Sequence, residues 1–250
     1  MEKLELEKYR QKLGYNLGQL ELDYYQHLIL AKIFEKFNKL YFKGGTCLQK
    51  CYGIKRFSDD LDFNYEEPDI KEIIKLVEDV FETKISDFNK TKFGETFTIK
   101  FQGMLYNGSE QSMCKISFDF RRNDTYEEPM KKIVRPIYAD LPQYFLLALA
   151  EEEILAEKIR AIITRYQARD IYDLNELLIN NVKIRRDLVN KKLRTYNKTF
   201  DIAEFEEKLE EKRKIYDEEM KRLTNIYDDF DTCKKRILDA IKNTKKTHQK

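Results

Sequence analysis

Three aspartates are spaced so that they could meet around a metal ion. Asp60 and Asp62 alternate with two apolar residues, and Asp119 lies between two phenylalanines in a later segment. Side chains two residues apart on a strand point to the same face of a sheet. If the two segments are neighbouring strands, about 4.8 Å apart, the three carboxylates come together. Three such groups could hold two metal ions about 3.5–4 Å apart, the arrangement used for in-line nucleotidyl transfer.

Each carboxylate also has an ordinary structural explanation. Asp60 and Asp62 could form the solvent-facing side of a polar strand, and Asp119 could be an exposed acid on an edge strand. However, neighbouring carboxylates repel each other unless something positive lies between them. Mg²⁺ takes one or two carboxylates together with substrate phosphates. The joint pattern therefore favours a metal site.

A glycine pair upstream of the aspartates adds a phosphate-binding element. The apolar run 40–43 is followed by Gly44, Gly45 and Thr46, which predicts a short strand that ends in a tight turn. We expect Thr46 to be the N-cap of a helix over residues 47–52. Backbone N–H groups at such a turn can approach a phosphate closely, although glycine pairs are also common in ordinary strand-to-helix turns.

The spacing of apolar residues along the chain predicts the helices and strands that position these side chains. Helical patterns and period-two strand patterns come first, and helical patterns alone follow after about residue 140. We therefore expect an α/β core with N-terminal helices over residues 1–140 and a helical part over residues 141–250. The expected helices cover residues 4–40, 47–52, 70–80, 146–178 and 201–245, and the expected strands cover residues 40–43, 56–65, 96–101 and 115–120.

Composition excludes several classes of protein. The 250 residues are 42% hydrophobic, which is enough for a packed core and argues against wholesale disorder. Only 8 glycines and 4 prolines disfavour an all-β fold. With 47 basic and 45 acidic residues the net charge is +2, so any nucleic-acid surface must be local. Short apolar runs, a charged N-terminus and four cysteines without CxxC spacing predict a cytoplasmic protein with no membrane span.

These motifs resemble a known family. The segments 42–46, 52–53 and 56–63, followed by 153–161 and 164–174, are similar to the AbiEii/AbiGii-type toxins of the DNA polymerase β-like nucleotidyltransferase superfamily. The likeness is strongest over residues 20–65 and 115–178. It implies an α+β fold, in which a mixed sheet flanked by helices is followed by a helical C-terminal part that completes the active-site cleft.

The resemblance also implies roles for individual residues. The superfamily often has a Gly-Ser pair at the strand-to-helix turn, whereas Gly-Gly-Thr is ordinary within the toxin family. The implied metal ligands are Asp60, Asp62 and Asp119. The implied catalytic residues are these three together with Lys158 and Asp170. The implied nucleotide-binding residues are Gly44, Gly45, Thr46, Ser58 and Lys158.

Some of these residues have simpler explanations. Lys158 borders an apolar helix stripe and could be a snorkelling surface lysine. Asp170 and Arg165 could belong to a surface ion-pair cluster, which contributes little to stability. His27 is interpreted as a packed helix histidine. The net-basic segment 183–194 is the best candidate for contact with RNA.

The activity expected from the sequence is therefore that of a Mg²⁺-dependent nucleotidyltransferase toxin, which transfers NMP from an NTP to an RNA acceptor such as the tRNA 3′ end. By resemblance it belongs to a type IV toxin–antitoxin or abortive-infection system, with a cognate antitoxin as partner, and we expect a monomer. Two alternatives remain open within the same fold: nucleotidylation of a protein hydroxyl, and a non-catalytic module that binds a nucleotide or a partner. A third, a helical RNA-binding protein without chemistry, leaves the carboxylate pattern unexplained.

Overall fold

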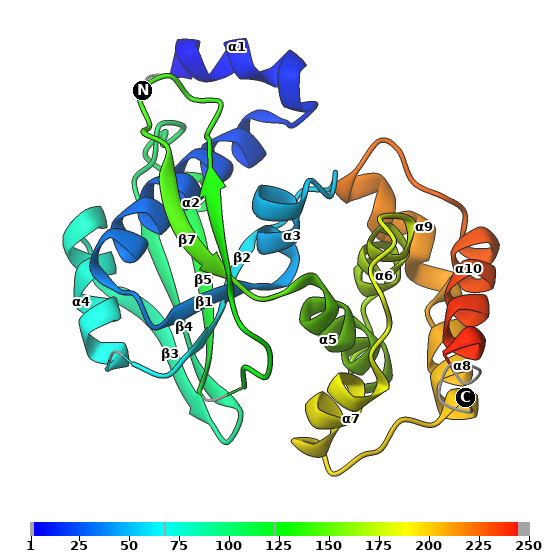
Figure 1. Ribbon diagram of the computed structural model, residues 1–250. Coiled ribbons are helices and arrows are strands. Elements are labelled where there is room, and N and C mark those ends of the chain that lie inside the picture. Colours follow the sequence, from blue (N-terminus) through cyan, green and yellow to red (C-terminus); the bar gives the residue numbers. More distant parts are fainter. Residues whose placement is uncertain (1–2, 68, 123, 245–250) are drawn as a thin grey trace. The chain divides into compact units, whose positions relative to one another are not determined.

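The structure is a computed structural model that describes residues 3–67, 69–122 and 124–244 (Figure 1). The chain divides into two compact units. Unit 1 comprises Met1–Gly53, Phe57–Thr125 and Pro129–Ala148, and unit 2 comprises Ile54–Arg56, Tyr126–Glu128 and Leu149–Lys250. Unit 1 contains a mixed sheet flanked by helices, and unit 2 is helical, which confirms the predicted fold class.

Unit 1 is built on a seven-stranded sheet with the order β3-β4-β5-β2-β1-β7-β6. Strands β2 and β5 are parallel, as are β1 and β7, and the remaining neighbours are antiparallel. The strands are β1 (Leu40–Lys43), β2 (Asp60–Tyr65), β3 (Ile85–Thr91), β4 (Gly94–Phe101), β5 (Cys114–Arg122), β6 (Met130–Val134) and β7 (Tyr144–Ala148).

One face of this sheet is an aromatic core. Phe63 of β2 stacks on Phe120 of β5 with ring centroids 5.0 Å apart, and Phe97 of β4 stacks on Phe118 at 4.7 Å. Helix α2 (Leu17–Lys36) covers this face through Phe34, and α4 (Ile70–Phe81) packs beside it (Figure 1). Fully burying each phenylalanine contributes about 1.5–3 kcal/mol. The alternating residues of β2 and β5 consequently point to the opposite, polar face.

The helical pattern over residues 4–40 forms two helices rather than one, and the expected strand follows from residue 40. Helix α1 (Lys3–Leu13) ends at Gly14, whose φ of 71° is left-handed. Asn16 then caps α2. Its side chain accepts a hydrogen bond from the Gln19 N–H at 2.9 Å, and the Gln19 side chain accepts one from the Asn16 N–H. The helix is therefore interrupted at Gly14 and Asn16, although the apolar periodicity continues through them.

The helix after β1 begins earlier than expected. Helix α3 (Gly44–Tyr52) includes both glycines and Thr46, and its N-cap residue is Lys43. The prediction of Thr46 as the N-cap was therefore wrong: Thr46 lies inside the helix, and its hydroxyl donates to the backbone carbonyl oxygen of Asp60 in β2. The helix ends where expected, at Gly53, whose φ is 73°.

Unit 2 consists of six helices in the described chain. Residues 146–148 belong to strand β7, so the expectation of a helix from residue 146 was wrong there. The pattern over residues 201–245 is divided among three helices. The six are α5 (Glu151–Thr164), α6 (Arg169–Ile179), α7 (Arg186–Arg194), α8 (Ile202–Glu210), α9 (Arg213–Leu223) and α10 (Phe230–Asn243). Among the residues described, no helix has the length and apolar character needed to cross a membrane.

Candidate active site

The parallel pairing of β2 and β5 brings two of the predicted metal ligands side by side. Asp62 and Asp119 are register partners, and Asp60 is the partner of Ser117 on the same ladder. All three aspartates are partly exposed, whereas Leu61 and Phe63, which alternate with Asp60 and Asp62 along β2, are fully buried on the other face. The predicted neighbourhood of the two strands is therefore confirmed, and adjacent strands lie about 4.8 Å apart.

Gly44 fits against Asp62 because it has no side chain. Its φ is 75°, and a Cβ added there would lie 2.1 Å from Asp62 Oδ2. Glycine adopts this left-handed conformation readily, whereas other residues adopt it at a cost. Gly45 is buried in the first turn of α3. The turn thus needs its first glycine for two reasons, the backbone conformation and the close approach of a carboxylate.

Thr46 and Gln26 hold the start of β2, including the backbone of Ser58, in place. The Thr46 hydroxyl donates to the Asp60 carbonyl oxygen at 2.5 Å. The Gln26 side-chain amide donates to the Ser58 and Asp59 carbonyl oxygens, each at 3.0 Å. Thr46 and Ser58, which were both predicted to bind nucleotide, are buried. These contacts fix the backbone that carries Asp60 and, two residues later, Asp62.

Positive charges flank the carboxylates on both neighbouring strands. Lys43 of β1 is the register partner of Asp62. The Lys43 ammonium is buried and lies 4.0 Å from a carboxylate oxygen of Asp124. Arg121 Nε lies 3.5 Å from Asp119 Oδ1, and the Asp119 side chain is 35% exposed. The polar face thus combines accessible carboxylates with cations at its margins.

The donor set fits a hard divalent cation, but not as a closed three-ligand site. Within the described ranges, no group of three or more His, Cys, Asp or Glu side chains is arranged to hold a metal ion. The register pair Asp62 and Asp119 supplies oxygen ligands from two strands, which matches the one or two carboxylates that Mg²⁺ takes beside phosphate oxygens. Asp60 lies on the same face of β2, two residues from Asp62.

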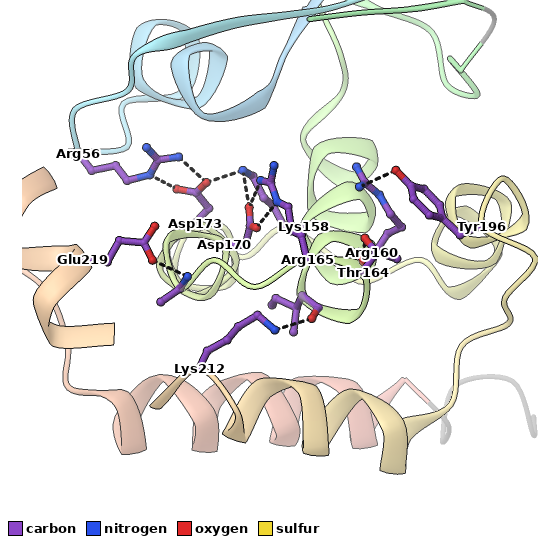
Figure 2. A network of polar contacts seen from close by, with 12 residues as sticks. Arg56, Lys158, Arg160, Thr164, Arg165, Asp170, Asp173, Tyr196, Lys212 and Glu219 are labelled. Carbon is purple, nitrogen blue, oxygen red and sulfur yellow. Dashed lines mark hydrogen bonds and ion pairs between the residues drawn. The ribbon is translucent and has the colours of Figure 1, made fainter. Parts of the chain in front are cut away.

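The two distal residues predicted from the resemblance lie together in unit 2. Lys158 of α5 contacts Asp170 Oδ1 at 3.1 Å and Asp173 Oδ2 at 2.6 Å (Figure 2). Arg165 donates two hydrogen bonds to Asp170, each 2.8 Å long. Lys158 and both aspartates are buried. Interpreting Lys158 as a snorkelling surface lysine was therefore wrong, and so was placing Asp170 in a surface cluster.

Arg56 and Asp173 complete this charge network, and the sequence analysis did not single them out. Arg56 donates to both Asp173 oxygens, at 2.5 and 2.7 Å, and both side chains are almost fully enclosed (Figure 2). Asp173 follows Asp170 by three residues, so the two lie on one face of α6. That spacing is the signal that could have found Asp173. No local pattern marks Arg56, because its partner lies 117 residues away.

The cations lower the pKa values of both carboxyls. Burial alone would raise the pKa of the Asp170 carboxyl, but Lys158 and Arg165 hold it well below its usual range. For Asp173, Arg56 and Lys158 likewise outweigh burial and lower the pKa. Both groups are ionised at neutral pH, so three cations surround two carboxylates in a low-dielectric environment. Removing one partner from such a network leaves an uncompensated buried charge.

The other expectations for single residues have clear outcomes. His27 is buried on α2, as predicted, and its Nδ1 lies 2.8 Å from the Tyr144 hydroxyl. Much of the basic segment 183–194 is used within unit 2. Lys192 is buried between Glu153 and Glu157, at 2.8 and 3.0 Å, and Arg185 pairs with Glu127. These internal contacts weaken the case for this segment as an RNA-binding surface.

Known proteins share this architecture. Among curated proteins no sequence matches the chain. MenT4, a nucleotidyltransferase toxin from Mycobacterium tuberculosis H37Rv, has a similar structure, with a TM-score of 0.66 and 21% identity over 96% of this chain and 88% of that one. JHP933 from Helicobacter pylori matches with a TM-score of 0.60 and 18% identity over 92% and 95% of the two chains. These similarities concern the fold.

The sequence itself establishes the family. Residues 28–236 match the family described as "Nucleotidyl transferase AbiEii toxin, Type IV TA system". This match spans the glycine turn, all three aspartates of the sheet and the buried network of unit 2. The chain belongs to the AbiEii family of nucleotidyltransferase toxins of type IV toxin–antitoxin systems.

Proposed function

We propose that this nucleotidyltransferase uses an NTP and Mg²⁺ and transfers NMP to an RNA hydroxyl, with the tRNA 3′ end as the acceptor. The observation that carries the proposal is the register pairing of Asp62 with Asp119 next to Gly44. It places two carboxylates on the polar face of the sheet, beside a turn whose backbone can approach a phosphate. NTPs and tRNA are both present in the cytoplasm, which stays the expected compartment.

In this proposal Asp62 and Asp119 are the first metal ligands, and Asp60, two residues along the same face of β2, joins them as a third when the ion binds. They would hold Mg²⁺, which would supply charge neutralisation for the triphosphate and for the pyrophosphate that leaves as the acceptor hydroxyl attacks the α-phosphate. Asp119 is the candidate base, whose carboxylate oxygen accepts the proton of the attacking hydroxyl. Because such catalysis consists mainly of positioning and charge neutralisation, loss of one carboxylate costs several orders of magnitude in rate.

The glycine turn has a separate task in the proposal. Gly44 and Gly45 offer backbone N–H groups to the triphosphate at the start of α3. Thr46 acts by holding the backbone of Asp60, to which its hydroxyl is already bonded, and Ser58 is buried with its carbonyl oxygen bonded to Gln26. We therefore treat these two as positioning residues rather than as direct phosphate ligands.

Lys158 and Asp170 remain catalytic candidates. To contact a phosphate directly, the Lys158 ammonium would have to release a carboxylate partner, because it contacts both Asp170 and Asp173. Arg165 is the accessible cation of this network, with 41% of its side chain exposed. The alternative is that Asp170 positions Lys158 and Arg165 without touching the substrate.

These two roles are separable by kinetics. Lys158→Met and Arg165→Met are each compared with the wild type for kcat and KM toward the NTP, together with the melting temperature. A phosphate contact predicts impaired nucleotide use beyond any loss of stability. A lower melting temperature with unchanged kinetic constants would assign Lys158 to structure alone.

The acceptor is tested by supplying each of the four α-³²P-labelled NTPs with Mg²⁺ and total cellular RNA. We expect label in an RNase-sensitive band, and sequencing of its 3′ end should identify tRNA. Label that survives RNase and disappears with protease would support transfer to a protein hydroxyl instead. NTP binding in a calorimetric titration without turnover on RNA or protein would support a non-catalytic module.

The partner and assembly state complete the proposal. The family's toxin–antitoxin context implies a cognate antitoxin. We expect the toxin itself to be a monomer, which sedimentation equilibrium measures directly.

A further inference from the structure

The two edges of the sheet in unit 1 differ in how they are protected against pairing with another strand. Strand β3 carries an irregularity between Ser86 and Asn89, and within it Asp87 has a φ of 56°. A bulge twists an edge strand out of regular register and so keeps that edge from adding a further strand. This edge is therefore blocked by its own geometry.

Strand β6, at the opposite edge, has no such irregularity. Its five residues pair with β7 in unbroken register from Met130↔Ala148 to Val134↔Tyr144. In the part of the chain that the structure describes, no strand pairs with its outer side. A regular edge presents unpaired backbone N–H and C=O groups that can receive a strand.

Apolar side chains are exposed at this regular edge. Ile133 and Phe145 are direct register partners across β6 and β7, and they are 45% and 50% exposed. Ile137, just beyond the strand, is 38% exposed. Neighbouring exposed apolar side chains of this kind mark interaction sites more often than isolated ones do.

Basic residues flank this apolar pair. Lys131 and Ile133 of β6 and Arg135, which directly follows the last strand residue Val134, are spaced two residues apart, and all three are exposed. Residues at this spacing on an extended chain share a face. The Lys131 ammonium lies over the Phe145 ring, 4.8 Å from its centroid. The edge therefore presents a cation and an apolar residue, and a second cation lies just past the end of the strand.

The charges beside β6 indicate which kind of partner could bind there. A second copy of this chain would bring the Lys131 and Arg135 side chains of the two edges together, and like charges on paired strands are unfavourable. An RNA strand would satisfy the cations but would leave Ile133 without an apolar partner. An extended peptide with an acid, an apolar residue and an acid at alternate positions satisfies all three side chains.

We propose that β6 is a docking edge for an extended acidic segment of a separate protein, which pairs as an eighth strand beside Lys131 and Ile133 and reaches Arg135 just past the end of β6. Main-chain hydrogen bonds supply the binding energy, and the alternating side chains supply specificity. The acid–x–apolar–x–acid pattern reads the same in both directions, so it suits either strand orientation. Strands β1 and β7 lie between β6 and β2, so this surface is separate from the metal-ligand candidates.

The test uses the full chain and a fluorescein-labelled peptide, Thr-Glu-Thr-Val-Thr-Glu-Thr, with fluorescence anisotropy as the readout. We expect saturable binding that falls about tenfold or more in Ile133→Asp, because that variant places a negative charge opposite the apolar residue. The matched control Ile226→Asp, at a residue 80% exposed in unit 2, should bind as the wild type does. Circular dichroism and the transferase assay verify that both variants are folded and active.

Two further peptides keep the test decisive even if Ile133→Asp fails to fold. A peptide N-methylated at alternate residues retains its side chains but cannot complete the ladder, so its binding to the wild type should be lost. Replacing both glutamates by lysine should also abolish binding. Equal binding of the N-methylated peptide, or no binding of the parent peptide at millimolar concentration, would overturn the proposal. So would single-stranded RNA crosslinking at position 133, or a dimer that Ile133→Asp dissociates.

Discussion

The two units each contain a cluster of charged side chains, and the clusters differ in their balance of charge and exposure. On the sheet of unit 1, Asp62 and Asp119 are neighbours in register, and the Asp119 side chain is 35% exposed. In unit 2, Asp170 and Asp173 are completely buried, and each makes ion pairs with two cations. The first cluster is accessible to a ligand, whereas the second is already satisfied by the protein.

The two clusters should therefore differ in what they contribute, the one in unit 1 to catalysis and the one in unit 2 to folding stability. Carboxylates that share a strand face repel each other, and the exposed pairing of Asp119 with Arg121 offsets only a small part of that repulsion. A buried, hydrogen-bonded network of opposite charges, in contrast, becomes strongly destabilising when one partner is removed. We therefore expect substitutions in unit 1 to affect catalysis first, and substitutions in unit 2 to affect folding first.

The largest effect is expected for Asp62→Asn. Loss of one metal-ligand charge should lower the rate of NMP transfer by about three orders of magnitude or more, because the substitution removes electrostatic stabilisation in the transition state. The unfolding free energy should change by no more than about 1 kcal/mol, since the site is partly exposed. Transfer of ³²P label and urea unfolding are measured on the same preparation. Full activity in the folded variant would remove Asp62 from the site.

The next effect is expected for Asp173→Ala. Arg56 and Lys158 would then be buried with one carboxylate partner fewer, which should cost about 3–5 kcal/mol of unfolding free energy. The matched control is Glu35→Ala, which breaks an exposed pair with Lys32 and should cost less than about 1 kcal/mol. Both values come from urea unfolding. Equal costs would show that the buried network is no more important than a surface pair.

A smaller effect is expected for Gly44→Ala. The alanine would need a left-handed φ, and its Cβ would collide with Asp62, for a combined cost of about 2–3 kcal/mol. Gly53→Ala is the control, because Gly53 has a similar φ of 73° but open space around it, and should cost about 1 kcal/mol. Transfer activity should fall in the Gly44 variant alone. If both variants lose activity equally, contact with Asp62 is not the reason for the glycine.

The smallest effect is a pH dependence that distinguishes the units. Burial lowers the pKa of His27 to about 3, so the unfolded state binds a proton at higher pH than the folded state does. Unit 1 should therefore lose stability as the pH falls below about 6.5, by about 2 kcal/mol at pH 5. The lowered pKa values of Asp170 and Asp173 act on unit 2 only below about pH 4. Urea unfolding at pH 7 and pH 5 should show this loss in the wild type and not in His27→Gln.

Local patterns in the sequence predicted much of the sheet and part of the site. Alternation of apolar and polar residues located β2, β4 and β5, and it placed Asp60 and Asp62 on one face. The glycines located the end of β1 and the end of α3. These features depend on residues close in sequence, so periodicity and backbone preferences are sufficient to find them.

Features that depend on distant partners were missed. Strand β7 was taken for the start of a helix, because an apolar run of that length suits either structure until its neighbours β1 and β6 are known. Thr46 bonds to a strand that begins 14 residues later, and Arg56 pairs with a residue 117 positions away. Burial of Lys158 likewise follows from α6 packing against α5, which helix periodicity alone does not specify.

The central claim is that Asp62 and Asp119 together hold the metal that serves nucleotidyl transfer. A crystal structure of the full chain with Mg²⁺ and a non-hydrolysable NTP analogue tests it directly. We predict a metal ion about 2.1 Å from oxygens of both carboxylates and from a phosphate oxygen of the nucleotide, next to Gly44. A nucleotide and metal bound elsewhere, or Asp62 and Asp119 turned away from a bound nucleotide, would contradict the account.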